Sequence, residues 1–100
     1  MMDGERHLLI VEDDATFART LQRSFERRGY TVQVAAGPGE LDARLAGFSP
    51  GYAVVDLKLG TASGLTCVER LHAHDPAMLI VVLTGFASIT ISIGNGTRPA

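Results

Sequence analysis

A short apolar run ends in a carboxylate within Tyr52-Ala53-Val54-Val55-Asp56-Leu57-Lys58-Leu59-Gly60. The run predicts a buried β-strand over residues 52–56, and the glycine predicts a loop behind it. Such a strand would bring Asp56 to its C-terminal end, where open parallel sheets bind their ligands. Taken alone, Asp56 could equally be a residue of the following turn, because aspartate is a common turn former.

Strand-like and helix-like segments alternate along the rest of the chain. Apolar runs predict strands over residues 7–11, 30–35, 52–56 and 78–83. Amphipathic spacing and helix-end signals predict helices over residues 15–28, 40–46 and 64–74. This alternation predicts an α/β domain, in which a parallel sheet carries helices on both faces.

The C-terminal part of the sequence follows a different pattern. Ser88-Ile89-Thr90-Ile91-Ser92-Ile93 alternates polar and apolar residues and then meets Gly94-Asn95-Gly96. A period of two predicts a half-buried strand with a turn behind it, and not a fourth helix. We therefore divide the chain into a domain over residues 1–87 and an atypical tail over residues 88–100.

Composition narrows the class of protein. One hundred residues with 46% hydrophobic and 20% charged side chains are typical of one small globular domain, or part of one. No apolar run approaches the roughly 20 residues that span a bilayer, and acidic Asp3 and Glu5 argue against a signal peptide. We therefore expect a cytoplasmic location without membrane contact.

A net charge of −2 argues against nucleic acid as a partner of this segment, and the single cysteine, Cys67, excludes an internal disulfide framework.

Polar side chains stand where three of the predicted strands end. Glu12 and Asp13 follow the first strand, Asp56 ends the third, and Thr84 follows the fourth. If the first strand lies between the second and third, the three acids converge at one edge of the sheet. Clustered carboxylates raise one another's pKa unless a cation lies among them, and Mg²⁺ prefers such hard oxygen ligands. These residues therefore predict a magnesium site.

The same group of residues suits phosphoryl transfer. A carboxylate beside Mg²⁺ can attack phosphorus and form an aspartyl phosphate, while a hydroxyl such as that of Thr84 donates to a phosphoryl oxygen. A simpler interpretation also stands for each motif. Glu12-Asp13-Asp14 could only cap the next helix, and Thr84 could be an ordinary hydroxyl at a strand end.

Taken together, the motifs resemble the receiver domain of two-component response regulators. The resemblance covers residues 7 to about 88 and is carried by Leu8-Leu9-Ile10-Val11-Glu12-Asp13-Asp14, Val54-Val55-Asp56 and Val81-Val82-Leu83-Thr84-Gly85. The residues around Asp56 and Thr84 further resemble the global redox-responding regulators of that family. The resemblance implies a flavodoxin-like (CheY-like) doubly wound parallel sheet with strand order 2-1-3-4.

The resemblance also implies roles for individual residues. Asp56 would accept a phosphoryl group from a sensor histidine kinase. Glu12, Asp13, Asp56 and the backbone carbonyl of Lys58 would hold Mg²⁺, with Asp13 a more direct ligand than Glu12. Thr84 would be the switch hydroxyl. The domain would be a signalling module of transcriptional regulation and not a turnover enzyme.

The chain departs from the receiver pattern at its C-terminal end. Receivers carry a lysine at the end of a fifth strand, an aromatic switch residue on that strand and a last helix, whereas the only lysine here is Lys58. We therefore expect an incomplete receiver in which residues 79–83 would form an exposed, apolar edge. Residues 88–93 would either replace the missing strand or pair between chains, giving a homodimer or strand-swapped dimer through residues 78–93.

Two other functions are compatible with the sequence. Without the lysine, the chain could be a phosphorylation-silent pseudo-receiver that acts as a dimerisation or interaction module. A metal-dependent phosphatase of the aspartyl-phosphate type is the weaker alternative, because Lys58 and not a second aspartate stands two residues after Asp56.

Overall fold

A computed structural model of the 100-residue chain describes residues 6–56, 62–83 and 88–92. Helices and strands alternate up to the fourth strand, as the sequence predicts. In chain order they are β1 (His7–Val11), α1 (Ala15–Arg27), β2 (Thr31–Ala35), α2 (Pro38–Leu45), β3 (Tyr52–Asp56), α3 (Ala62–His74), β4 (Leu79–Leu83) and β5 (Ser88–Ser92). Within the described ranges, no helix combines the length and the apolar character needed to cross a membrane.

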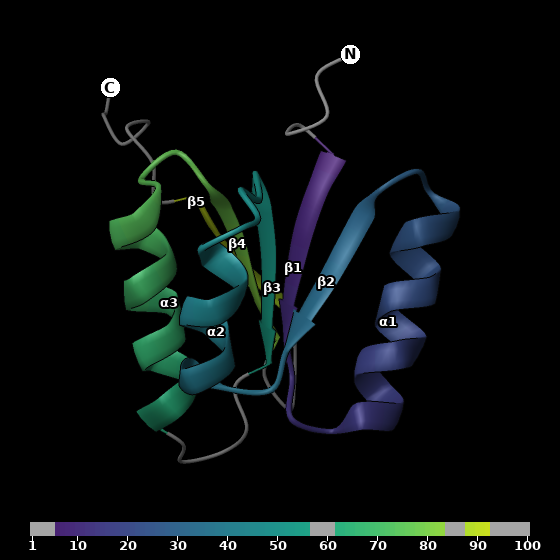
Figure 1. The fold of residues 1–100 in the computed structure, drawn as a ribbon, viewed down its shortest axis with the longest axis horizontal. Helices are drawn as coiled ribbons and strands as arrows, with labels where there is room; N and C mark the ends of the chain where they lie inside the picture. Colours follow the sequence, from purple (N-terminus) through teal and green to yellow (C-terminus); the bar gives the residue numbers. More distant parts are fainter. Residues whose placement is uncertain (1–5, 57–61, 84–87, 93–100) are drawn as a thin grey trace.

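The five strands form one sheet in the order β2-β1-β3-β4-β5 (Figure 1). The first four strands are parallel to one another, which confirms the flavodoxin-like fold and the strand order 2-1-3-4. Because β1 lies between β2 and β3, Val11 at its end is in register with both Ala35 and Val55. The ends of these strands therefore meet at one edge of the sheet.

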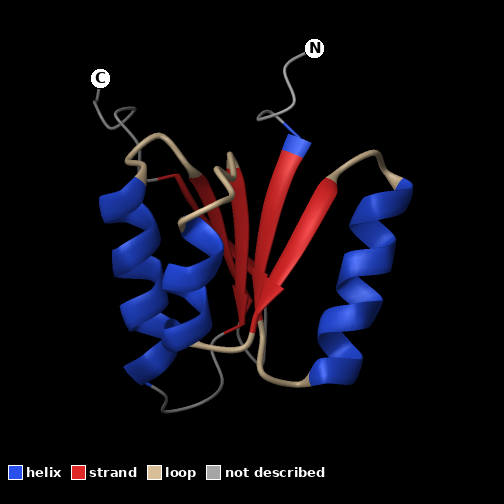
Figure 2. Cartoon of the chain, in the orientation of Figure 1, coloured by secondary structure: helices blue, strands red, loops and turns tan. Residues whose placement is uncertain are grey.

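Helices cover both faces of the sheet, with α2 and α3 on one face and α1 on the other (Figure 2). Because side chains alternate along a strand, Leu9 of β1 packs in the core cluster that includes residues of α2 and α3. Its neighbours Leu8 and Ile10 pack in the cluster that includes Leu21 and Phe25 of α1. The central strands are apolar on both faces for this reason.

Helix ends follow the local chemistry with small differences from the prediction. Asp14 caps α1, since its Oδ1 accepts hydrogen bonds from the backbone N–H groups of Thr16 and Phe17 at 3.0 and 3.1 Å. Gly29, at a φ of +93°, allows the chain to leave that helix. Helix α2 begins at Pro38, two residues earlier than predicted, because proline suits the first turn where its missing N–H has no helical partner. Helix α3 begins at Ala62, so Gly64 lies inside its first turn.

The tail forms strand β5, which confirms that residues after 87 extend the sheet. β5 pairs antiparallel with β4, and this direction follows from a short connection, since a parallel neighbour would need a crossover of a dozen residues or more. Ile91 and Ile89 are in register with buried Ile80 and Val82. Within the described residues the edge of the sheet is therefore β5, and the expected exposed edge at residues 79–83 is covered within the same chain.

Candidate functional site

The three successive acids after β1 have three different environments. Glu12 is only 3% exposed and continues the pairing of β1 with β2, because its N–H donates to the carbonyl of Ala35 at 3.0 Å. Its Oε2 accepts a hydrogen bond from the N–H of Asp14 at 2.9 Å. Asp14 is the helix cap, whereas the side chain of Asp13 is exposed. The acidic run therefore combines an inward carboxylate, an outward carboxylate and a helix cap. The capping interpretation is confirmed for Asp14, and the metal-binding interpretation of Glu12 and Asp13 stays a prediction.

Asp56 lies at the end of β3, beside the acidic run. The register of the parallel pair matches Val11 with Val55, so Glu12 and Asp56 follow at neighbouring strand ends. Neighbouring strands are about 4.8 Å apart. On its other side Asp56 is in register with Leu83, the last residue of β4, and its side chain is half-buried. The predicted convergence of the ends of β1, β3 and β4 is present.

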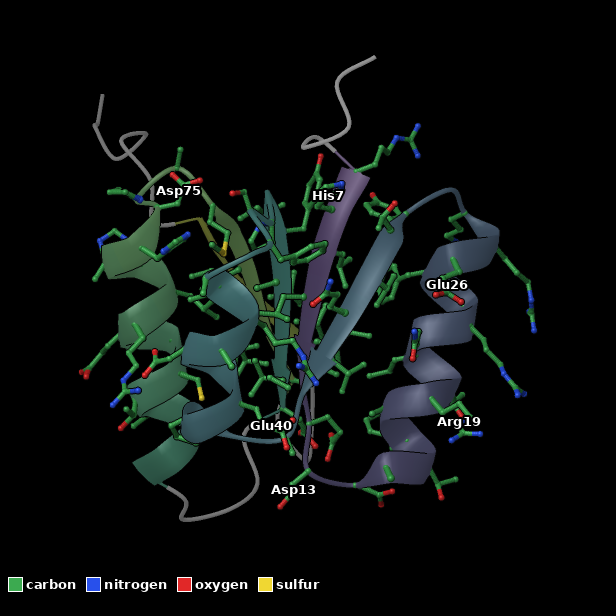
Figure 3. All side chains as sticks on the ribbon, viewed as in Figure 1. His7, Asp13, Arg19, Glu26, Glu40 and Asp75 are labelled. Atoms are coloured by element: carbon green, nitrogen blue, oxygen red, sulfur yellow. The ribbon has the colours of Figure 1, made fainter. Side chains whose placement is uncertain are left out.

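A further acid, Glu40, lies at the same end of the sheet as Asp13, while His7 and Asp75 lie at the opposite end (Figure 3). Glu40 belongs to the first turn of α2, and its Oε1 accepts a hydrogen bond from the N–H of Ala36 at 3.0 Å. The same oxygen lies 3.8 Å from Nη2 of Arg44. Our sequence interpretation overlooked Glu40, although an acid in the first turn of a helix is a recognisable signal.

No closed metal site is present in the part of the chain that the structure describes, where no three Asp, Glu, His or Cys side chains form a group able to hold an ion. The acids at the strand ends are therefore an open arrangement of oxygen donors and not a complete cage. Lys58 and Thr84 lie outside the described residues, so their roles stay predictions.

Cys67 lies on α3 and packs in the core cluster shared with α2. Burial raises the pKa of its thiol, an effect that Arg70 opposes and Asp42 reinforces. A thiol kept protonated and covered in this way is a poor nucleophile. Cys67 is accordingly a packing residue, apart from the acidic edge.

The comparison with protein families decides the identity of the domain. The model of the response regulator receiver domain matches residues 8–94. The chain belongs to this family. Receiver domains are signalling modules and not a classical enzyme family.

The receiver domain has similar curated relatives. It is 37% identical over 93 residues to the acid tolerance regulatory protein ActR of Sinorhizobium medicae, covering 93% of this chain and 48% of that protein. It is 44% identical over 90 residues to the photosynthetic apparatus regulatory protein RegA of Rhodovulum sulfidophilum, covering 86% of this chain and 47% of that protein. The chain spans about half the length of these relatives. Both belong to the RegA/ActR group of global regulators, which confirms the resemblance found in the motifs.

A solved structure shares the fold. It is a response regulator protein from Burkholderia pseudomallei with a phosphorylated aspartic acid, a calcium ion and citrate. The TM-score is 0.74 at 37% sequence identity, and the match covers 83% of this receiver domain and 49% of that chain.

Proposed function

We propose that this receiver domain accepts a phosphoryl group on Asp56 from a sensor histidine kinase. The observation that supports it best is the half-buried carboxylate of Asp56 at a strand end, beside the end that carries Glu12 and Asp13. A carboxylate oxygen of Asp56 attacks the phosphorus of the phosphohistidine, the phosphorus–nitrogen bond breaks, and the imidazole leaves. The related structure from Burkholderia pseudomallei, with its phosphorylated aspartic acid, makes Asp56 the natural candidate in this chain.

The residues present fit Mg²⁺. This ion is usually bound by one or two carboxylates and keeps several waters, so an open pair of strand-end acids suits it better than a closed cage. Asp13 is the more direct ligand in this proposal, because its side chain is exposed whereas Glu12 Oε2 accepts the N–H of Asp14. Asp56 and the carbonyl of Lys58 complete the proposed set. When bound, the ion neutralises charge that builds on the phosphoryl oxygens.

Thr84 is the proposed switch hydroxyl. The residue follows Leu83, which is in register with Asp56, so its position in the chain is directly after a strand end that neighbours the proposed phosphoacceptor. A hydroxyl there can donate to a phosphoryl oxygen on Asp56. Substitution by alanine should then leave Mg²⁺ binding unchanged and slow phosphorylation.

Intact-protein mass spectrometry after incubation with acetyl phosphate and Mg²⁺ tests the function. We expect the mass of one phosphoryl group to be gained by the chain, lost in Asp56→Asn and kept in Asp42→Asn, which alters an exposed carboxylate on α2. A chain that is folded by circular dichroism and binds Mg²⁺ but gains no phosphoryl group would contradict the proposal.

A second candidate function is the phosphorylation-silent interaction module, and strand β5 favours it. β5 reads Ser-Ile-Thr-Ile-Ser and contains no lysine. Because β5 is antiparallel to β4, its first residue, Ser88, is in register with Leu83 at the acidic edge. An uncharged edge strand without proline invites pairing with another copy. In this candidate function two chains join through β5, within residues 78–93.

Membership of the receiver family also suggests the output of the whole protein and its location in the cell. Transcriptional control would belong to the part of the longer relatives that this chain does not span, without direct nucleic-acid binding by this segment. A cytoplasmic location would give the domain access to the histidine kinase. We keep the division at residue 87 as a proposal, and the family match itself extends to residue 94.

A further inference from the structure

Asp14 joins helix α1 to the acidic end of β1 through four hydrogen bonds. Its Oδ1 accepts from the N–H groups of Thr16 and Phe17 at 3.0 and 3.1 Å, and its carbonyl accepts from the N–H of Ala18 at 2.9 Å. Its own N–H donates to Oε2 of Glu12 at 2.9 Å. The residue therefore holds the first turn of the helix with its oxygens and holds Glu12 with its nitrogen.

Glu12 carries its carboxylate into buried surroundings. Of the charged residues in the described part of the chain, Glu12 alone is buried. Burial of a carboxylate is costly unless hydrogen bonds or opposite charge compensate for the lost hydration. The N–H of Asp14 provides one such bond, and Asp14 is the N-cap of α1, where the positive end of the helix dipole favours an anion. The position of the carboxylate is therefore tied to the start of the helix.

The backbone of Glu12 is fixed without any help from Asp14. Its N–H donates to the carbonyl of Ala35 at 3.0 Å, which continues the pairing of β1 with β2. Leu8 and Ile10 pack in the cluster that includes residues of α1, and alternation along the strand places Glu12 on the same face. Only the side chain of Glu12 remains to be fixed, and its torsions would otherwise lose their freedom when a cation binds.

We propose that Asp14 is a positioning residue for the magnesium site. Its cap on α1 fixes its own N–H, and this N–H orients the carboxylate of Glu12 before the ion binds. The inference rests on the proposed function, in which Glu12 belongs to the ligand set. A carboxylate has about four lone-pair positions, so the bond from Asp14 leaves acceptor capacity for a cation. Loss of a group that orients a metal ligand typically lowers metal affinity by about 10- to 100-fold.

The charge of Asp14 and its geometry can be separated by two variants. Any carboxylate near the other acids attracts a cation, whatever hydrogen bonds it makes. Asp14→Asn removes the charge and retains an oxygen that can cap the helix, whereas Asp14→Ala removes both. The two variants have the same net charge, so the difference between them isolates the cap.

Calorimetric titration with Mg²⁺ alone compares the two variants. Asp14→Ala should bind the ion about tenfold more weakly than Asp14→Asn. Thr20→Gly is the structural control, because it loosens the exposed middle of α1 and leaves both Glu12 and Asp14 in place. This control should bind Mg²⁺ as the native chain does. If Asp14→Ala does not fold, Asp14→Gly replaces it, since glycine also lacks the capping oxygen and is tolerated at the start of a helix.

A second measurement needs no metal. In the metal-free chain, NMR-detected hydrogen exchange should show the N–H of residue 14 protected in the native chain, in Asp14→Asn and in Thr20→Gly. The same N–H should exchange several-fold faster in Asp14→Ala, because the residue that carries it is no longer held by the cap. This result is independent of the affinity for Mg²⁺.

Several outcomes would overturn the inference. These are equal Mg²⁺ affinity in Asp14→Asn and Asp14→Ala, a loss in Thr20→Gly as large as that in Asp14→Ala, or an unprotected N–H at residue 14 of the native chain. A native chain without measurable Mg²⁺ affinity would overturn the inference together with the proposed ligand set.

The inference and the phosphoacceptor role of Asp56 fail separately, because the titration uses no phosphoryl donor. Equal affinities in a chain that gains a phosphoryl group would contradict only the role of Asp14. The expected order of affinities in a chain that gains no phosphoryl group would contradict only the proposed function.

Discussion

The backbone N–H of Asp14 donates to Oε2 of Glu12 at 2.9 Å, which ties the buried carboxylate to the first turn of α1. The same aspartate caps that helix through its own side chain. Glu12 and Asp14 therefore help to hold the loop, whereas the side chain of Asp13 is exposed at the same strand end. Because the three acids have different roles, mutating each one should affect a different set of properties of the domain.

Asp13→Asn should weaken Mg²⁺ binding by about tenfold or more, equivalent to about 1.4 kcal/mol, because it removes a negative charge from the proposed ligand set. The free energy of unfolding without Mg²⁺ should stay within about 0.5 kcal/mol, since the side chain is exposed. Calorimetric titration measures the affinity. Glu40→Gln, at the same end of the sheet, is the matched control, and an equal loss there would mean that general charge and not ligation accounts for the effect.

Asp14→Ala should lower the free energy of unfolding by about 1 kcal/mol, because the N–H groups of Thr16 and Phe17 lose their cap. Asp14→Asn should retain most of the stability, since the asparagine oxygen can accept the same bonds. Urea denaturation followed by circular dichroism compares the two. Similar stability of both variants with the native chain would show that the cap contributes nothing measurable.

The thiol of Cys67 should make stability depend on alkaline pH. Burial raises its pKa above the ordinary 9.0, so as the pH rises past that value the unfolded chain releases the proton first. The stability linked to this thiol is complete below pH 9.0 and is lost as the pH climbs towards the raised value. Denaturation of the native chain and of Cys67→Ala, both under reducing conditions, measures the difference. That difference should be constant below pH 9.0 and shrink above it, and a constant difference throughout would contradict the prediction.

If chains associate through β5, Thr90→Lys should convert dimers to monomers, because a charged residue on an edge strand opposes pairing between copies. Light scattering over a range of protein concentrations measures the oligomeric state. Thr20→Lys adds the same charge to the exposed surface of α1 and should leave the dimer intact. A native chain that stays monomeric at high concentration would rule out the association.

Much of the fold could be predicted because its signals are local. The apolar runs of β1 and β3 mark strands that are covered on both faces, and Asp14 with Gly29 marks both ends of α1. The start of α2 was less predictable, since a proline between glycines indicates a turn as readily as the first residue of a helix. The direction of β5 depends on the strand with which it pairs. An alternation of polar and apolar residues predicts a strand but does not determine its partner or its direction.

The site could be predicted in part for a similar reason. Parallel strands bring their ends to one edge whatever the details, so the position of Asp56 beside the strand end that carries Glu12 and Asp13 followed from the fold class. The tasks of neighbouring acids depend on individual hydrogen bonds, such as that from Asp14 to Glu12, which no spacing reveals.

The antiparallel direction of β5 determines where the chain leaves the sheet. Ser88 is in register with Leu83 and Ser92 with Leu79, so β5 runs from the acidic edge back to the edge at which β1 begins with His7. Both ends of the described sheet region therefore emerge on the side away from Asp56. An affinity handle or a fluorescent label attached directly at His7 or at Ser92 would therefore begin at the edge of the sheet opposite Asp56. A parallel last strand would have sent any attachment at its end out beside the edge that carries Asp56.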